Sequence, residues 1–190
     1  VRARAEYISG RLEMLLENAL QGLALVLALL FLFLNVRTAF WVAAGIPTAL
    51  CAAIAVMYLA GITINMISLF ALLITLGIVV DDAIVVGEHS DQRARMGLDP
   101  VNAAETAAKR MALPVFAATS TTVIAFFGLI AVGGRFGDFL SDIPFTVAAV
   151  LAASFFECFL ILPHHMAQSL KHGIKDHWYD APSRFVNIGF

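Results

Sequence analysis

Charged residues are scarce in this chain, at 14% of 190 residues compared with about 25% in soluble globular domains. Hydrophobic residues make up 61% of the chain, and the mean hydropathy is +0.87. This composition predicts a membrane protein. The net charge of −2 also leaves no cluster of basic residues of the kind that binds nucleic acid, so we exclude that class of partner.

Cysteine is rare as well. Cys51 and Cys158 both fall in apolar segments, where a thiol behaves as a small buried hydrophobe, so we expect no disulfide framework. The first long apolar run lacks the basic region that precedes the core of a signal peptide. The chain begins with Val1 rather than methionine, and we expect it to be a fragment of a longer protein.

Five apolar runs approach the roughly 20 residues that a membrane-spanning helix needs. The predicted fold is therefore an all-α membrane protein, an antiparallel bundle of five transmembrane helices. An amphipathic lead-in helix is expected over residues 1–16, and a cytoplasmic helical hairpin over residues 88–113. Within the bundle (17–163), the spans are expected at about 17–35, 39–60, 63–87, 114–132 and 143–162.

Helix ends are marked by capping residues. Asp99 is suited to cap a helix whose first turn contains Pro100. Asp142 is expected to cap the fifth span, and Pro163 to end it. Beyond that proline, residues 164–190 are expected to form an amphipathic segment in the membrane interface, because apolar residues recur at every fourth position: Met166, Leu170, Ile174 and Trp178.

The loops differ in their content of basic residues, which predicts an orientation. Eight lysines and arginines would share one side of the membrane and four the other, so the first side is expected to be cytoplasmic. The eight are Arg37, Arg93, Arg95, Lys109, Arg110, Lys171, Lys175 and Arg184, and the four are Arg2, Arg4, Arg11 and Arg135.

Two adjacent carboxylates, Asp81 and Asp82, interrupt the third apolar run. An aspartate at the centre of a spanning helix costs roughly 2.5–3.5 kcal/mol, so such groups usually face the bundle interior or a water path. We interpret the pair as a proton-coupling site that lines a crevice between helices. The structural alternative is that one aspartate caps a break in the helix or lies at its interfacial end.

The two carboxylates should behave as one coupled unit, because desolvation and a neighbouring like charge both disfavour ionisation. Such a unit can load and release protons. No Lys or Arg occurs inside any of the five expected spans. We therefore expect the pair to need a cationic partner from outside this chain, or a hydrated cavity.

Three further polar residues lie at membrane depth. Thr119 and Thr122 share one helical face and could hydrogen-bond the aspartates, or could instead donate back to carbonyls of their own helix. Glu157 is a second intramembrane acid, which could join a water path or hydrogen-bond a neighbouring helix.

No metal or cofactor is expected. The spacing of the histidines does not bring four ligands to one face, so we interpret them as solvated or interfacial side chains. They are His164, His165, His172 and His177. Trp41 near the start of a span is interpreted as an interfacial anchor to membrane lipid.

The segment from Gly77 to Val86, followed by Glu88, resembles the fourth transmembrane helix of resistance-nodulation-division (RND) efflux pumps. The resemblance extends to the segment 61–65, the hairpin at 97–100, the threonine-rich fourth span and the Leu162-Pro163 pair. The chain would correspond to transmembrane helices two to six of the N-terminal half. One departure is Gly87-Glu88-His89, where the family more usually has Val-Glu-Asn.

The resemblance implies a proton-driven antiporter of the bacterial inner membrane rather than an enzyme. It implies a homotrimer that works with a periplasmic adaptor and an outer-membrane channel. Asp81 and Asp82 would be the proton-relay residues, completed by a lysine, an arginine and a threonine from the C-terminal half of the same transporter. The doubled aspartate favours the multidrug branch, which exports small hydrophobic or amphiphilic compounds.

Two alternatives stay open at this point. The first is another exporter of the same superfamily, for metals or lipids or as an accessory to protein export. The second is a membrane scaffold without transport activity, in which the acids would be structural.

Overall fold

The computed structural model describes residues 2–34, 36–134, 137 and 140–171. Five helical stretches within these ranges are long and apolar enough to cross a membrane, which agrees with the five predicted spans. The helices are α1 (Arg2–Phe33), α2 (Val36–Leu59), α3 (Met66–Arg95), α4 (Pro100–Phe127), α6 (Asp142–Phe156) and α7 (Leu162–Lys171). Short helices η1 (Ile130–Val132) and η2 (Glu157–Ile161) complete the described elements.

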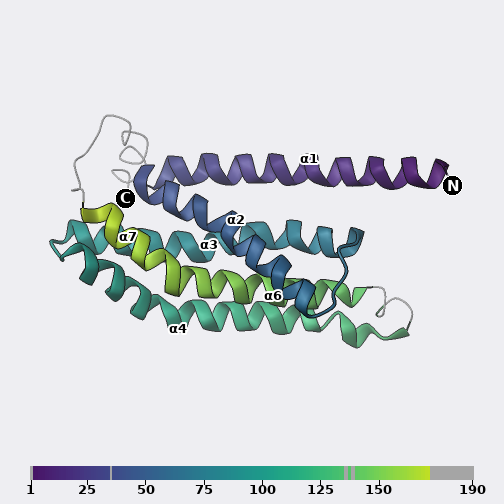
Figure 1. Ribbon diagram of the computed structural model, residues 1–190. Coiled ribbons are helices and arrows are strands. Elements are labelled where there is room, and N and C mark those ends of the chain that lie inside the picture. Colours follow the sequence, from purple (N-terminus) through teal and green to yellow (C-terminus); the bar gives the residue numbers. More distant parts are fainter. Residues whose placement is uncertain (1, 35, 135–136, 138–139, 172–190) are drawn as a thin grey trace.

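Helix α6 lies at the centre of the bundle. It packs against α2, α3 and α4, and it is the most deeply buried of the five spans. Helix α1 lies along one side of the bundle, where it contacts α2 and α3 (Figure 1). Helix α2 crosses α3 and α6 obliquely in Figure 1 and contacts both of them.

The buried apolar side chains form two clusters along the length of the bundle. One cluster joins the starts of α2 and α4 to the second half of α3 and to α7. The other joins the second half of α2 to α6 and the first half of α3. On α3 the clusters meet at Val79, which belongs to the second, and Val80, which belongs to the first. Asp81 and Asp82 follow directly, so the two acids lie where the clusters adjoin.

The helix starts are held by side-chain caps. Asp99 accepts a hydrogen bond from the Val101 amide, with Pro100 in the first turn, which confirms the predicted cap. Asn65 caps α3 by accepting bonds from the amides of Ile67 and Ser68. The Asn65 amide group also donates to the Asp142 carboxylate, so it ties the start of α3 to the start of α6. Asp142 therefore bridges two helices and does not cap its own, whose Ncap is Ser141.

Helix α4 begins at Pro100 and passes through Pro114, the residue at which a separate fourth span was expected to begin. The polar segment before Pro114 and the apolar run after it therefore form one continuous helix. Proline within a membrane helix is tolerated where neighbouring groups satisfy the carbonyl that loses its partner. The described helix ends at Phe127, and η1 follows it over Ile130–Val132.

The helix that contains the last span does not end at Pro163, as the sequence predicted, but continues to Lys171. The physical reason lies in the π-turn η2, whose last hydrogen bond joins the amide of Leu162 to the carbonyl of Glu157, five residues back. Proline has no amide hydrogen and cannot continue an α-helical ladder. The π-turn shifts the hydrogen-bond register just before Pro163, so the chain stays helical through it.

The described part of the expected interfacial segment packs on protein. Met166 and Leu170 are buried, and α7 contacts α2, α3 and α4. These first two of the four apolar residues that recur at every fourth position therefore face the bundle. They do not face lipid, as the sequence pattern suggested. Ile174 and Trp178 lie outside the described residues.

Gly87 lies where α3 passes closest to the start of α2. A Cβ atom at this position would lie 3.1 Å from the Cγ2 atoms of both Thr38 and Val42. Such contacts are tighter than ordinary van der Waals packing. Glycine at this position, one of the departures from the family pattern, therefore allows close approach of the two helices.

Restoring the more usual valine, Gly87→Val, is expected to destabilise the full-length protein by about 1–3 kcal/mol through overpacking. Thermal unfolding of the purified protein in detergent would measure this as a lower midpoint. Adding Val42→Ala should recover part of the loss, because it removes one of the two opposing methyl groups. An unchanged midpoint in Gly87→Val would contradict the close packing.

Candidate functional site

Asp82 lies in the middle of α3 and is half-buried. The hydroxyl of Thr119 on α4 donates to its Oδ2 atom at 3.5 Å, the outer limit of a hydrogen bond. Val79, Val80 and Ala83 next to it are buried in the core. One oxygen of this carboxyl therefore faces α4, in a surrounding that is mostly apolar.

Asp81 points to a different part of the molecule. It is exposed and lines a cavity of about 310 Å³ between α1 and α3. Val26 and Leu29 of α1 form one wall of this cavity, and apolar residues of α3 such as Gly77 and Ile84 form the other. A carboxylate in such a position would be costly against lipid, so it calls for water or further protein.

The two carboxyls therefore diverge, as expected for successive helical residues separated by ~100°. Among the described residues they do not share one cavity, in contrast to the single crevice that the sequence suggested. Asp82 faces α4, whereas Asp81 faces the α1 side of α3.

Basic side chains are absent from the spans that surround the pair. The chain contains no Lys or Arg over residues 38–92, 111–134 and 137–170. Within the described ranges, neither aspartate has an ion pair. A cation that forms an ion pair with these carboxylates would therefore have to come from a part of the protein outside these segments.

The two threonines of α4 behave differently. Thr119 reaches Asp82, whereas the hydroxyl of Thr122 donates to the carbonyl of Ala118 at 3.1 Å in its own helix. Thr121 makes the same kind of bond to Ala117. Thr119 is thus the threonine of this cluster that is placed to orient the carboxyl of Asp82.

This difference predicts unequal effects of mutation on the stability of the full-length protein. Thr119→Val should destabilise it by about 0.5–1.5 kcal/mol, the net contribution of one hydrogen bond. Thr119→Ser should retain the stability, and Thr122→Val should leave it near wild type. Equal thermal midpoints for the two valine variants, measured in detergent, would contradict the assignment.

Glu157 is buried, with 5% of its surface exposed, and it lies against Gly45 of α2. A Cβ atom on Gly45 would lie 2.5 Å from Oε1 and 2.9 Å from Oε2 of this carboxyl. The sequence predicts an intramembrane acid at Glu157 but no role for Gly45. The only sequence signal for Gly45 is a glycine two residues before Pro47 in a helix.

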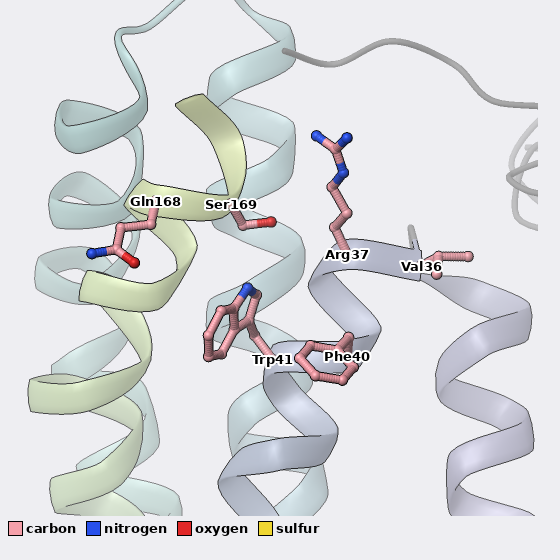
Figure 2. A pocket seen from close by; sticks show the side chains of 6 residues that line it. All are labelled: Val36, Arg37, Phe40, Trp41, Gln168 and Ser169. Atoms are coloured by element: carbon pink, nitrogen blue, oxygen red, sulfur yellow. The ribbon is translucent and has the colours of Figure 1, made fainter. Parts of the chain in front are cut away.

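A second cavity, of about 470 Å³, lies at the end of the bundle where α2 begins and α7 ends. Figure 2 shows the rings of Phe40 and Trp41 below the guanidinium group of Arg37, with Gln168 and Ser169 on α7. Trp41 also stacks on His165, with ring centroids 4.2 Å apart. This arrangement is typical of the end of a membrane helix and separate from the aspartate pair.

Five membrane-length helices with acids inside the bundle define a multi-pass membrane protein. The model of the AcrB/AcrD/AcrF family matches residues 1–188. The chain therefore belongs to the AcrB/AcrD/AcrF family, the RND multidrug efflux permeases, which are transporters and not enzymes.

The chain is also similar to curated proteins that are named multidrug resistance proteins. The chain is 32% identical over 188 residues to "Multidrug resistance protein MdtC" of Klebsiella pneumoniae (strain 342), a match that covers 98% of the chain and 18% of that protein. It is 31% identical over 169 residues to the MdtC protein of Pantoea ananatis, covering 88% of the chain and 16% of that protein. The chain thus spans less than a fifth of the length of these relatives.

Proposed function

We propose that this chain is the transmembrane part of an RND exporter driven by the proton-motive force, with Asp81 and Asp82 as its proton-relay pair. The observation that carries the proposal is two adjacent carboxyls in the middle of α3, without an ion pair among the described residues. Charged groups inside membrane segments are expensive and mark ion or proton pathways. Thr119 is proposed to support the pair by orienting Asp82.

Protonation of the pair would relieve both its desolvation and its mutual repulsion. Ionisation would favour an arrangement in which water or a cation reaches the carboxylates. A proton that crosses the membrane contributes roughly 2.3 kcal/mol per 100 mV, which can shift a bundle between two packings. The cation is proposed to come from the C-terminal half of the transporter.

The substrates and partners follow from the family. The relatives are named multidrug resistance proteins, which supports export of drugs. We propose that the exported compounds are small and hydrophobic or amphiphilic, and that export occurs by proton antiport. We propose a homotrimer in the inner membrane that works with a periplasmic adaptor and an outer-membrane channel. The junction of α3 and α4 is proposed to form the cytoplasmic hairpin, because basic residues gather there: Arg93, Arg95, Lys109 and Arg110.

The proposed function can be tested with the full-length transporter in cells that lack other exporters. We expect extrusion of an amphiphilic dye, and we expect a protonophore to abolish it. Extrusion that continues in the presence of the protonophore would overturn the proton coupling. Resistance to divalent metals without dye extrusion would instead favour the metal-exporting alternative, and failure of both would favour a scaffold.

A further inference from the structure

Glu157 is a buried acid that the aspartate relay does not use. Only 5% of its surface is exposed, in the middle of a stretch from Asp142 to Lys171 that is long enough to span the membrane. It has no ion pair among the described residues. An ionised carboxylate in such a place is costly, and groups of this kind are usually functional.

The carboxyl of Glu157 lies against α2, in the space left by the absence of a side chain at Gly45. Both of its oxygens lie within 3 Å of the position that a Cβ atom on Gly45 would occupy. Any side chain at position 45 would collide with the carboxyl, so the glycine provides the space in which it lies. The acid therefore lies against α2 and does not extend towards the membrane surface, as long charged side chains usually do.

The backbone at Glu157 is also unusual. This residue begins the π-turn η2, and its carbonyl accepts the amide of Leu162, five residues on. π-turns are rare and occur frequently at functional sites. Next in the chain, Cys158 is fully buried in the same core cluster as Val80 and Ala83, the residues that flank the aspartates on α3.

Two further polar side chains lie close to Glu157 along the chain. Cys158 follows it directly and is completely buried. One turn earlier on α6, the Ser154 hydroxyl is buried without a hydrogen-bond partner among the described residues. An unsatisfied buried hydroxyl is a place where an internal water can bind.

From this geometry we infer that Glu157 is a second proton-accepting group of the bundle, held against Gly45 on the α2 side of the core. The inference rests on the proposed proton coupling and adds a carboxyl to it. The step is a proton transfer alone, in which the Glu157 carboxylate takes a proton from a hydronium ion, leaving a water molecule, and later returns the proton to water. Glu157 would thereby exchange protons with the aspartate pair through buried water.

Few other titratable groups surround Glu157. Helix α3 contributes Asp82, η2 contributes Cys158, and α7 contributes His164, His165 and, at its end, Lys171. Residues 38–50 of α2 and 111–127 of α4 contain no titratable side chain. On α6 the other acid is Asp142, at the start of the helix. Few titratable groups of the described residues are therefore close enough to obscure a change in the charge of Glu157.

Infrared difference spectroscopy of the purified full-length transporter can detect this carboxyl as the pH changes from about 5 to about 9. We expect a protonated carboxyl band that titrates in this range and is lost in Glu157→Gln. It should persist in Asp81→Asn/Asp82→Asn, so failure of the aspartate relay would not remove it. Glu105→Gln, which changes an exposed glutamate paired with Lys109, is the matched control and should leave the band unchanged.

A spectrum of Glu157→Gln that matches wild type would overturn the inference. If Glu157→Gln does not fold, Glu157→Asp provides the second test, because the band should then change in frequency but still titrate. Gly45→Ala should shift the band by displacing the carboxyl. An unchanged band in both Glu157→Asp and Gly45→Ala would equally overturn the inference.

The transport assay separates this role from a merely structural one. In proteoliposomes, Glu157→Gln should flatten the pH dependence of substrate-driven proton movement, whereas Glu157→Asp should restore a pH-dependent profile. If Glu157 only fills space against Gly45, Glu157→Gln would keep the wild-type pH profile, and the inference would be wrong.

Discussion

Replacing Asp82 with asparagine is expected to reduce export by the full-length transporter to the level of cells that lack it. Asparagine has nearly the shape of aspartate and can still accept the hydrogen bond from Thr119, but it cannot carry a proton. A loss in Asp82→Asn would therefore report on proton loading rather than on packing. Dye extrusion and resistance to an amphiphilic toxin, at matched protein levels in the membrane, are the measurements.

Glu88→Gln is the matched control for this experiment. Glu88 lies six residues further along the same helix and is exposed. Glu88→Gln removes one negative charge, as Asp82→Asn does. Its substitution should leave export near wild type. Export that persists in Asp82→Asn, or that falls as far in Glu88→Gln, would contradict the role of Asp82.

The second large effect is that of a substitution on folding and stability, at the contact where α2 packs on α6. Ala53 is completely buried in the cluster that also contains Val147 and Val150 of α6. Ala53→Leu would add three carbon atoms to this contact, and overpacking of a well-packed core costs about 1–3 kcal/mol or more. We expect a lower yield of folded transporter and a lower thermal midpoint in detergent.

Ala52→Leu makes the same chemical change one residue earlier, at an exposed position. It should leave the yield and the thermal midpoint close to wild type, because a leucine facing lipid or solvent meets no neighbour in this bundle. Equal effects of the two substitutions would show that the assigned face of α2 is wrong.

Much of this architecture follows from local patterns in the sequence. The five spans are visible because membrane helices need long apolar runs, and the Asp99 cap is visible because a capping residue followed by proline marks a helix start. Asp81 and Asp82 can also be identified from sequence as a candidate site, since an acid in an apolar run is energetically expensive. These signals depend only on neighbouring residues.

Other features depend on residues far apart in the chain. Pro163 was expected to end a helix, but the π-turn before it shifts the hydrogen-bond register so that the helix continues. No local pattern in the sequence predicts that turn. The contact of Gly45 with Glu157 joins two helices separated by more than a hundred residues. The divergence of Asp81 from Asp82 likewise depends on where α1 and α4 pack around α3.

The central claim is that Asp81 and Asp82 carry protons, and proton movement in proteoliposomes tests it most directly. The full-length transporter would be reconstituted with a pH-sensitive dye inside the vesicles, and proton entry would be followed after substrate is added across a pH gradient. We predict substrate-dependent proton movement for the wild type and none for Asp81→Asn/Asp82→Asn. Wild-type proton movement in that double variant would contradict the account.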